Sequence, residues 1–482
     1  MTTIIGNVIT VRDPTPELRQ YVKDQLELPN PEYVKKERMG FWTGRTPKTL
    51  RLYEWNGNAL VLPFGLCREL MPLLKAGKIW NTFTGGTDVD YGKPIPLYEY
   101  QSLAVANMVA RTYGILKSPA GSGKTQAMLA VIQAIGKKAL WICHTADLLK
   151  QSLDRALIYM NESLMGTITE GKVNIGTGIT FATVQTLCNV DLERYRNEWD
   201  VIVVDECHRV SQSATTVSRY QKVLNNLSAR HKYGCTATPA RSDGLIKATF
   251  ALIGQVVYEV PDEAVADKTM NVVVRPVYTE TEITDECLNV DGTINYVKLI
   301  CHLTTDEQRN RLIVSKIVKE KGHSCIILSD RLAQLEAIMN MLPDDMKEKS
   351  AFINGKMQSK KAKAERENLI EQMRTGEKLY LFASVSLCKE GLDVPRLDRL
   401  FFASPVKFSS VVIQSVGRIQ RVFPGKCMPI VYDFVDNNIG FCERAFKERK
   451  RSYRKVDAEI EVPLNEPYKA SQYMAFDESQ VQ

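Results

Sequence analysis

Residues 118–125, Ser-Pro-Ala-Gly-Ser-Gly-Lys-Thr, limit the possible folds more than any other segment of this chain. They directly follow the apolar run at residues 113–116 and end where a helix can begin. An apolar strand, a glycine-rich turn and a Lys-Thr pair at the start of a helix together form a cradle for phosphate groups. Ser118 departs from the usual pattern, which has glycine at this position. The segment predicts an α/β domain that binds a nucleotide.

Each polar group of this segment has a predicted contact with a triphosphate. Gly121, Ser122 and Gly123 offer backbone N–H groups that can curl around an anion. Lys124 brings a positive charge to the β- and γ-phosphates, and the Thr125 hydroxyl is a ligand for Mg²⁺. A nucleoside triphosphate with Mg²⁺ is therefore the predicted ligand.

A pair of carboxylates follows a second apolar run. Residues 201–204 are Val-Ile-Val-Val, which is typical of a strand buried in a parallel sheet. The run leads directly into Asp205, Glu206, Cys207 and His208. Carboxylates at the tip of such a strand suit a second anchor for Mg²⁺ and a general base. The chain is therefore predicted to hydrolyse the triphosphate.

Length and composition set broad limits. A chain of 482 residues corresponds to about three domains. The eleven cysteines include no Cys-x-x-Cys pair, which favours reduced thiols over disulfides or zinc ligands. The start shows no secretory signal, and no apolar run approaches the roughly 18 residues of a membrane span. We therefore expect a cytoplasmic protein without a membrane partner. The net charge of +7 is compatible with a polyanionic partner.

The first part of the chain, residues 1–90, predicts a small α+β module. Residues 16–26 have the pattern of a helix, and residues 50–55 and 60–62 have the pattern of strands. The intervening Asn56-Gly57-Asn58 is a strong signal for a hairpin turn. A polar, glycine-rich stretch at residues 84–96 is interpreted as a linker.

Beyond the linker, short apolar runs alternate with amphipathic helices, which is the pattern of parallel βαβ units. Two sets of such units predict one α/β domain over residues 91–262 and another over residues 263–456. Residues 457–482 are polar and mixed in charge, and they are predicted to form an extended tail. The predicted fold class is α/β, with tandem parallel-sheet domains behind a small α+β module.

Further short motifs occur in a fixed order along residues 97–440. Gln101 precedes the phosphate loop and carries an amide able to pair with an adenine edge. Downstream lie segments at residues 144–151, 183–187, 205–208, 236–239, 391–395 and 414–421. This series resembles that of superfamily 2 helicases of the DExH type. The resemblance implies two RecA-like (P-loop) domains, with ATP held between them.

The resemblance also implies a role for each residue of the ATP site. Lys124, Thr125 and Asp205 would hold phosphates and Mg²⁺, and Glu206 would deprotonate the attacking water. His208, Thr236 and Thr238 would couple nucleotide state to domain movement, and Gly391 and Asp393 would approach the nucleotide from the second domain. Gln414 would position water, and Arg418 and Arg421 would be arginine fingers. If all three lie on one helix, the spacing places them on one face.

Nucleic-acid contacts are implied at strand and helix ends. The residues that match such positions in relatives are Thr145, Gln151, Thr183, Gln185, Ser329, Gly355 and Ser384. Hydroxyl, amide and backbone groups there would contact phosphate and sugar without reading bases. His144, where relatives usually have proline, and Ser384, where threonine is common, are departures from the family pattern.

Residues 238–244 and short aromatic and glycine-rich stretches near residues 41–66 are similar to UvsW-like phage branch-migration helicases and, more distantly, to XPB. This similarity implies a phage-type DNA helicase of DNA replication, recombination and repair. It would act as a monomer on forked, branched or junction DNA in the host cytoplasm, with replication or recombination proteins as expected partners. An RNA helicase, a double-strand DNA translocase that does not separate strands, and a nucleotide-gated scaffold are the alternatives.

Two basic clusters allow different interpretations. Cations at residues 35–51 alternate with Tyr33, Phe41, Trp42 and Tyr53, which suits either nucleic-acid contact or a solvated surface over a small aromatic core. A second cluster at residues 444–455 falls on a predicted helix and favours contact with a phosphate backbone.

Overall fold

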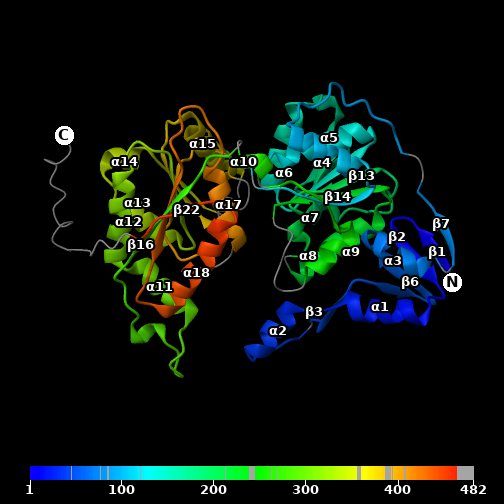
Figure 1. The fold of residues 1–482 in the computed structure, drawn as a ribbon, viewed down its shortest axis with the longest axis horizontal. Coiled ribbons are helices and arrows are strands. Elements are labelled where there is room, and N and C mark those ends of the chain that lie inside the picture. The colour runs from blue at the N-terminus through cyan, green and yellow to red at the C-terminus, as the bar shows by residue number, and fades with distance from the viewer. Residues whose placement is uncertain are drawn as a thin grey trace. The chain divides into compact units, whose positions relative to one another are not determined.

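The computed structural model describes residues 1–463, apart from residues 45, 76, 84–85, 120, 212, 238–244, 262, 267–268, 355–359, 386–391, 393 and 407–408. Four predicted site residues, Thr238, Gly355, Gly391 and Asp393, therefore lie outside the described residues. The chain divides into two compact units, residues 1–265 and 266–482 (Figure 1). Within the described residues, no helix has both the length and the apolar character needed to cross a membrane.

A small mixed sheet begins the first unit. Its strand order is β5 (Glu54–Asn56), β6 (Ala59–Pro63), β2 (Val8–Arg12), β1 (Thr2–Ile5) and β7 (Lys78–Asn81). Helix α1 (Pro16–Leu26) begins at Thr15, whose hydroxyl accepts a hydrogen bond from the Leu18 N–H, and it buries Leu18, Val22 and Leu26 at helical spacing. Strands β5 and β6 meet at a two-residue turn in which Gly57 has a φ of 58°. The predicted helix and hairpin are confirmed.

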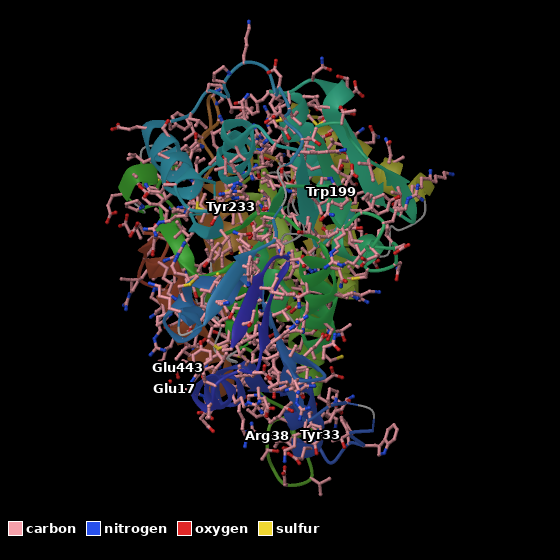
Figure 2. All side chains as sticks on the ribbon, turned by 90° about the vertical axis from the view of Figure 1, so that its right-hand side faces the viewer. Glu17, Tyr33, Arg38, Trp199, Tyr233 and Glu443 are labelled. Atoms are coloured by element: carbon pink, nitrogen blue, oxygen red, sulfur yellow. The ribbon has the colours of Figure 1, made fainter. Side chains whose placement is uncertain are left out.

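The predicted strand at residues 50–55 is wrong, because this segment divides between two sheets. Strand β4 (Thr49–Arg51) pairs with β3 (Glu27–Pro29), whereas β5 pairs with β6. Together with α2 (Pro31–Arg38), β3 and β4 form an arm, residues 27–51, that leaves the small sheet. Asn30 joins its two sides, since its amide donates to the Pro47 carbonyl at 2.8 Å. Figure 2 shows Tyr33 and Arg38 on this arm, at the lower edge of the view, whereas Tyr233 lies within the larger sheet.

The module and the larger sheet of the first unit share one hydrophobic core. Short helices η1 (Phe64–Leu66) and α3 (Cys67–Leu74) of the module pack where Tyr113, Ala248 and Ala251 are also buried. Gly65 has no side chain because a Cβ there would lie 2.6 Å from the Ala251 carbonyl oxygen. The module is therefore part of the folded first unit.

Lys232 lies in this contact and makes the stability of the first unit depend on pH. Its buried ammonium donates to the carbonyl oxygens of Asn7 (3.0 Å) and Leu224 (2.8 Å), and it sits over the Phe64 ring. Burial lowers the pKa of Lys232 from 10.5 to about 7. Between these values the unfolded chain holds a proton that the folded chain releases, so Lys232 makes stability rise with pH.

Lys232→Met is expected to remove this dependence. The stability of the wild type relative to the variant should increase from about pH 7 to about pH 9, where only the wild type has the titrating amine. Urea unfolding of both proteins across this range measures the difference. Parallel pH profiles would show that Lys232 keeps its proton in the folded state.

The larger sheet of the first unit has eight strands. Their order is β11 (Lys172–Asn174), β10 (Met165–Thr169), β12 (Ile179–Thr183), β9 (Ala139–Cys143), β13 (Val201–Val204), β14 (His231–Thr236), β8 (Tyr113–Lys117) and β15 (Val256–Glu259). All neighbours are parallel except β10 and β11. Alternate residues of the strands point to opposite faces. One face is covered by α4 (Glu99–Val109), α5 (Lys124–Ile135) and α6 (Ala146–Leu157). The other face is covered by α7 (Val184–Leu187), α8 (Ala214–Asn226) and α9 (Ile246–Ile253).

The described part of the predicted linker packs beside the amino-terminal ends of β9 and β12. Tyr91 is buried, and its hydroxyl donates to the carbonyl oxygens of Lys137 and Gly178, each at 2.9 Å. Ile95 is buried in the same core. This segment is therefore packed against the first unit and is not a free linker.

The second unit contains a seven-stranded sheet in which every described pair is parallel. The order is β18 (Ser350–Ile353), β19 (Tyr380–Ser384), β17 (Cys325–Ser329), β20 (Arg399–Phe402), β21 (Ile430–Val435), β16 (Val273–Tyr278) and β22 (Glu459–Ile460). Helices α12 (Glu307–Lys319), α13 (Leu332–Asn340) and α14 (Asp344–Glu348) cover one face. Helices α15 (Lys360–Thr375), α17 (Ser409–Ile419) and α18 (Gly440–Arg454) cover the other. The predicted fold class is confirmed, and the predicted tail begins with a strand on the sheet edge.

One member of the second basic cluster lies inside the fold. Arg449 on α18 forms two hydrogen bonds to the Asp433 carboxylate, at 2.8 and 2.9 Å, and donates to the Val406 carbonyl at 3.1 Å. Both partners of the ion pair are almost fully buried. Arg449 therefore has a structural role, and the expectation that it contacts a phosphate backbone is wrong.

Candidate functional site

The phosphate loop joins β8 to α5 in the first unit. Gly121 and Gly123 have φ angles of 82° and 74°, values that favour glycine. Lys124 begins α5, and its ammonium donates to the Pro119 carbonyl at 3.2 Å. The N-terminal end of a helix attracts anions through its unpaired N–H groups and its dipole. The described part of the loop thus has the backbone turns that a phosphate cradle requires.

Ser118 is accommodated by hydrogen bonds within the loop. It is buried, its N–H donates to the Thr236 carbonyl at 3.0 Å, and its hydroxyl lies 2.6 Å from that of Ser122. The Ser122 hydroxyl also contacts the Pro119 carbonyl at 2.7 Å. A hydroxyl at the first position therefore stabilises the loop where the usual pattern has glycine.

Helix α4 braces the loop from outside. The Gln101 amide donates to the Ser122 carbonyl at 3.0 Å, and its oxygen accepts from the Tyr98 N–H at 3.0 Å. The Tyr100 hydroxyl donates to the same Ser122 carbonyl. Gln101 is only 2% exposed, so both ends of its side chain are used within the protein. The sequence predicted an adenine contact for Gln101, and that contact stays a prediction. It gave no role to Tyr100, which belongs to no recognised functional pattern.

Asp205 and Glu206 lie directly after β13, whose two neighbours are β9 and β14. Asp205 accepts hydrogen bonds from the Glu206 N–H (2.9 Å), the Ser152 hydroxyl (3.2 Å) and the Cys235 thiol (3.3 Å). Ser152 and Cys235 orient this carboxylate, and no sequence pattern singled them out. Oxygen donors of the Asp205 and Thr125 type are those that Mg²⁺ prefers, so the donor set fits the metal that the motifs imply.

The electrostatics keep Glu206 ionised. Burial alone would raise the pKa of Glu206, but the charge of Lys124 and the contact with His208 lower it to about 2. Burial and the neighbouring charge of Glu206 raise the pKa of Asp205. Glu206 also has a φ of 46°, a left-handed conformation that is rare outside glycine and concentrates at functional sites. An ionised carboxylate held in this way can accept a proton.

A chain of polar contacts connects Glu206 to the phosphate loop. The Nδ1 atom of His208 lies 3.2 Å from Glu206 Oε2 and 2.8 Å from the Thr236 hydroxyl. The Thr236 carbonyl in turn accepts the Ser118 N–H that begins the loop. The structure thus brings together the predicted coupling residues His208 and Thr236.

The predicted strand-contact residues of the first unit lie along the same sheet edge. Thr145 follows β9 and caps α6, whereas Thr183 ends the neighbouring strand β12. Because carboxyl ends of parallel strands meet at one edge, these residues lie beside the Asp205 end of β13. Thr145, Gln151 and Gln185 are partly exposed, but Thr183 is only 5% exposed.

In the second unit, Ser329 and Ser384 end neighbouring strands at paired positions. Ser329 is fully buried, and its hydroxyl donates to the Gln334 side chain at 2.6 Å and accepts the Arg331 N–H at 3.0 Å. Ser384 is partly exposed. Of the two, Ser384 is the more accessible to a nucleic-acid backbone.

The predicted finger residues do not share one helix. Gln414 and Arg418 lie on α17, both partly exposed, but α17 ends at Ile419. The Gln420 carbonyl accepts the Met270 N–H at 2.7 Å, and Arg421 pairs with Thr269. Pairing with this neighbouring segment, together with Pro424 downstream, ends the helix. The prediction that all three lie on one helical face is therefore wrong for Arg421.

A known protein family matches the sequence of each unit. Residues 94–241 match the family of the type III restriction enzyme res subunit, and residues 307–423 match the helicase conserved C-terminal domain. The chain belongs to helicase superfamily 2, and these domains imply ATP-dependent helicase activity.

Several relatives lie within this superfamily. The chain is 26% identical to “Putative ATP-dependent RNA helicase L396” of Acanthamoeba polyphaga mimivirus, over 89% of this chain and 79% of the relative. It is 21% identical to the ATP-dependent DNA helicase uvsW of Enterobacteria phage T4, over 83% of each chain. It is 24% identical to the DNA 3'-5' translocase XPB2 of Sulfurisphaera tokodaii, over 68% of this chain and 79% of the relative. The predicted resemblance to UvsW-like helicases and XPB is confirmed.

Proposed function

We propose that this protein is an ATP-dependent DNA helicase or translocase that unwinds or branch-migrates forked or branched DNA. The observation that carries this proposal is the order of residues along one sheet edge of the first unit. The ends of β8, β13 and β14 bring phosphate-loop, carboxylate and coupling residues together, and the adjacent ends of β9 and β12 carry Thr145 and Thr183. A structural change at the nucleotide could therefore reach the residues that would contact a bound strand through adjacent strand ends of one sheet.

The chain's own residues divide the work of hydrolysis. Backbone N–H groups of the loop and Lys124 would hold the phosphates, and Thr125 and Asp205 would hold Mg²⁺, which neutralises charge on the phosphates when bound. Glu206 would orient the attacking water and accept its proton. His208 and Thr236 would report the state of Glu206 to the loop through the contacts described above.

The second unit would supply cations for the same reaction. We assign Arg418 and Arg421 as fingers that stabilise charge on the transferring phosphate, and Gln414 as a water-positioning group. Gly391 and Asp393 would approach the nucleotide, and Gly355 and Ser384 would contact the nucleic-acid backbone. Residues that contact the backbone rather than base edges would make movement largely independent of sequence.

We favour DNA as the substrate because two of the similar proteins, the DNA helicase uvsW and the DNA translocase XPB2, are named for action on DNA. The similarity to L396 covers 89% of this chain and supports RNA as the second candidate. ATP hydrolysis is expected to be stimulated many-fold more by forked DNA than by RNA of the same sequence and shape. Steady-state phosphate release with each nucleic acid measures this ratio. Greater stimulation by RNA would establish the alternative.

Strand separation needs its own test. A forked duplex with one labelled strand is expected to release that strand only when ATP is present. Lys124→Ala provides the matched control, because it removes the phosphate contact and should release no strand. ATP hydrolysis stimulated by duplex DNA without strand release would instead indicate a translocase that moves without unwinding. Deleting residues 1–90 would not isolate the module, because that change exposes the core it shares with the larger sheet.

A further inference from the structure

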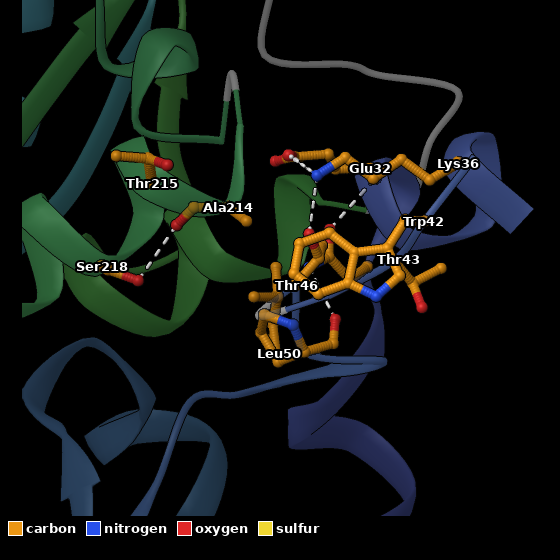
Figure 3. A pocket seen from close by; sticks show the side chains of 11 residues that line it. Glu32, Lys36, Trp42, Thr43, Thr46, Leu50, Ala214, Thr215 and Ser218 are labelled. Atoms are coloured by element: carbon orange, nitrogen blue, oxygen red, sulfur yellow. Dashed lines mark hydrogen bonds and ion pairs between the residues drawn. The ribbon is translucent and has the colours of Figure 1, made fainter.

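A cavity of about 610 Å³ lies between the arm and helix α8 of the first unit. Figure 3 shows arm residues Trp42, Thr43 and Leu50 on one side of it and the α8 residues Thr215 and Ser218 on the other. Pockets for small ligands typically measure about 300–1,000 Å³. The cavity thus has room for a ligand of nucleotide size, and none of the predicted ATP-site or strand-contact residues lines it.

The arm presents an aromatic ring beside this cavity. Trp42 is 85% exposed and its neighbour Phe41 is 64% exposed, a high cost for large apolar side chains in water. The Trp42 ring lies against Gly44, where a Cβ would come within 2.4 Å of a ring carbon. The absence of a side chain at Gly44 therefore lets the indole rest on the backbone. A flat ring supported in this way is a stacking platform for a base.

Several lining groups can contact sugar and phosphate, and the one lining carboxylate, Glu32, is paired with Lys36. Thr43, Thr215 and Ser218 offer hydroxyls, and Leu50 offers an apolar surface. Lys36 is fixed in place, because its ammonium contacts Glu32 at 3.0 Å and donates to the Thr46 hydroxyl at 2.7 Å (Figure 3). Hydroxyl and ammonium groups are common partners of nucleic-acid backbones.

The charge around the cavity favours a polyanion. In the sequence, the arm has six cations and three acids, and α8 has Arg219 and Lys222 and no acid. An excess of cations around an exposed aromatic ring is the pattern of single-strand binding surfaces. It fits a nucleic-acid strand better than a cationic or neutral peptide.

We propose that this cavity holds one unpaired nucleotide of a nucleic-acid strand, with its base stacked on Trp42. The inference rests on the proposed helicase function and deepens it, because it assigns a contact for the separated strand to the front module. Trp42 would be the specificity-determining contact for unpaired over paired nucleotides, since the faces of a base inside a duplex are covered by its stacked neighbours.

The test uses the full-length protein without ATP and a forked DNA carrying 2-aminopurine in one single-stranded arm. Stacking on the indole is expected to quench the 2-aminopurine fluorescence of the wild-type complex. Trp42→Ala should abolish the quenching and weaken binding of the single-stranded arm about 5- to 150-fold, as the loss of one stacked base does. Trp42→Phe should retain most of both signals.

Three further variants keep the test specific. Ser218→Trp changes an exposed position of α8 and should block the cavity without altering Trp42. Gly44→Ala should displace the indole and reproduce the loss. Trp80→Ala removes another exposed tryptophan, 61% exposed on β7 outside the cavity, and should leave quenching and affinity unchanged. Wild-type quenching and affinity in both Trp42→Ala and Ser218→Trp would overturn the proposal.

Failure of this proposal can be distinguished from failure of the helicase assignment. Because binding is measured without ATP, loss of quenching in the variants supports the cavity even if no strand is released in the presence of ATP. An RNA fork with the same label separates the substrates. Quenching seen only with the RNA fork would support the cavity and contradict the DNA assignment. ATP-driven unwinding of DNA, together with wild-type binding by Trp42→Ala, would support the DNA assignment and contradict the cavity.

Discussion

Glu206→Gln is expected to lower steady-state ATP turnover by about 10²–10⁴-fold, the usual contribution of a positioned general base. The amide has the same size and shape but cannot accept the proton of the attacking water. The low pKa of Glu206 means that the wild-type group is ionised throughout the neutral range, so the variant should be inactive over that range. Phosphate release in the presence of saturating nucleic acid measures the effect.

The controls for Glu206→Gln separate chemistry from binding. ATP binding by Glu206→Gln should remain, whereas Lys124→Ala should lose both binding and turnover, because Lys124 is the cation that we propose to hold the phosphates. Glu193→Gln changes an exposed carboxylate paired with Arg196 in the same unit, and it should leave turnover unchanged. Substantial turnover by a folded Glu206→Gln protein would remove Glu206 from the reaction.

Arg449→Met is expected to destabilise the second unit by about 3–5 kcal/mol, the usual cost of breaking a buried ion pair. The substitution leaves the Asp433 carboxylate buried, and among the described residues Tyr453 remains as its side-chain donor, at 2.7 Å. It also removes the bond to the Val406 carbonyl, which precedes α17. Native-state hydrogen exchange of β21 and α17 in the full chain measures the loss, and the α17 amides should open together with those of β21.

Two variants distinguish the buried pair from a general effect on α18. Arg451→Met removes an exposed cation from the same helix and should cost no more than about 1 kcal/mol. Asp433→Leu combined with Arg449→Met removes both charges, so it should cost less than Arg449→Met alone. Equal losses in the single and double variants would show that the uncompensated charge is not the cause.

The sequence sufficed wherever a local pattern decides the structure. Helix α1 has its cap, its proline and its apolar spacing within residues 15–26, and β13 is a run of buried β-branched residues. The phosphate loop and the carboxylates were recognisable for the same reason, because their chemistry needs particular residue types at fixed spacing. The order of the motifs then placed them at strand ends.

The features that could not be predicted depend on contacts with residues that are distant in the sequence. Residues 50–55 have a strand pattern, but only the presence of β3 and β6 divides them between two sheets. Arg421 leaves its predicted helix face because the segment near Thr269 pairs with it. The hydrogen bond from the Gln101 amide to the Ser122 carbonyl depends on how α4 packs beside the loop, and the adenine contact that the motif implies for Gln101 stays a prediction. Arg449 resembles any surface cation until Asp433 is placed beside it.

The shared core beneath the front module has a mechanical consequence. Since η1 and α3 are buried together with β8 and α9, the described residues of the front module and of the lobe that bears the phosphate loop pack around one shared core. A movement of that lobe should therefore also move the arm, because Leu28 and Leu50 of the arm are buried in the same core. A movement of the lobe caused by nucleotide binding or hydrolysis would then also displace a nucleic-acid strand bound at the arm.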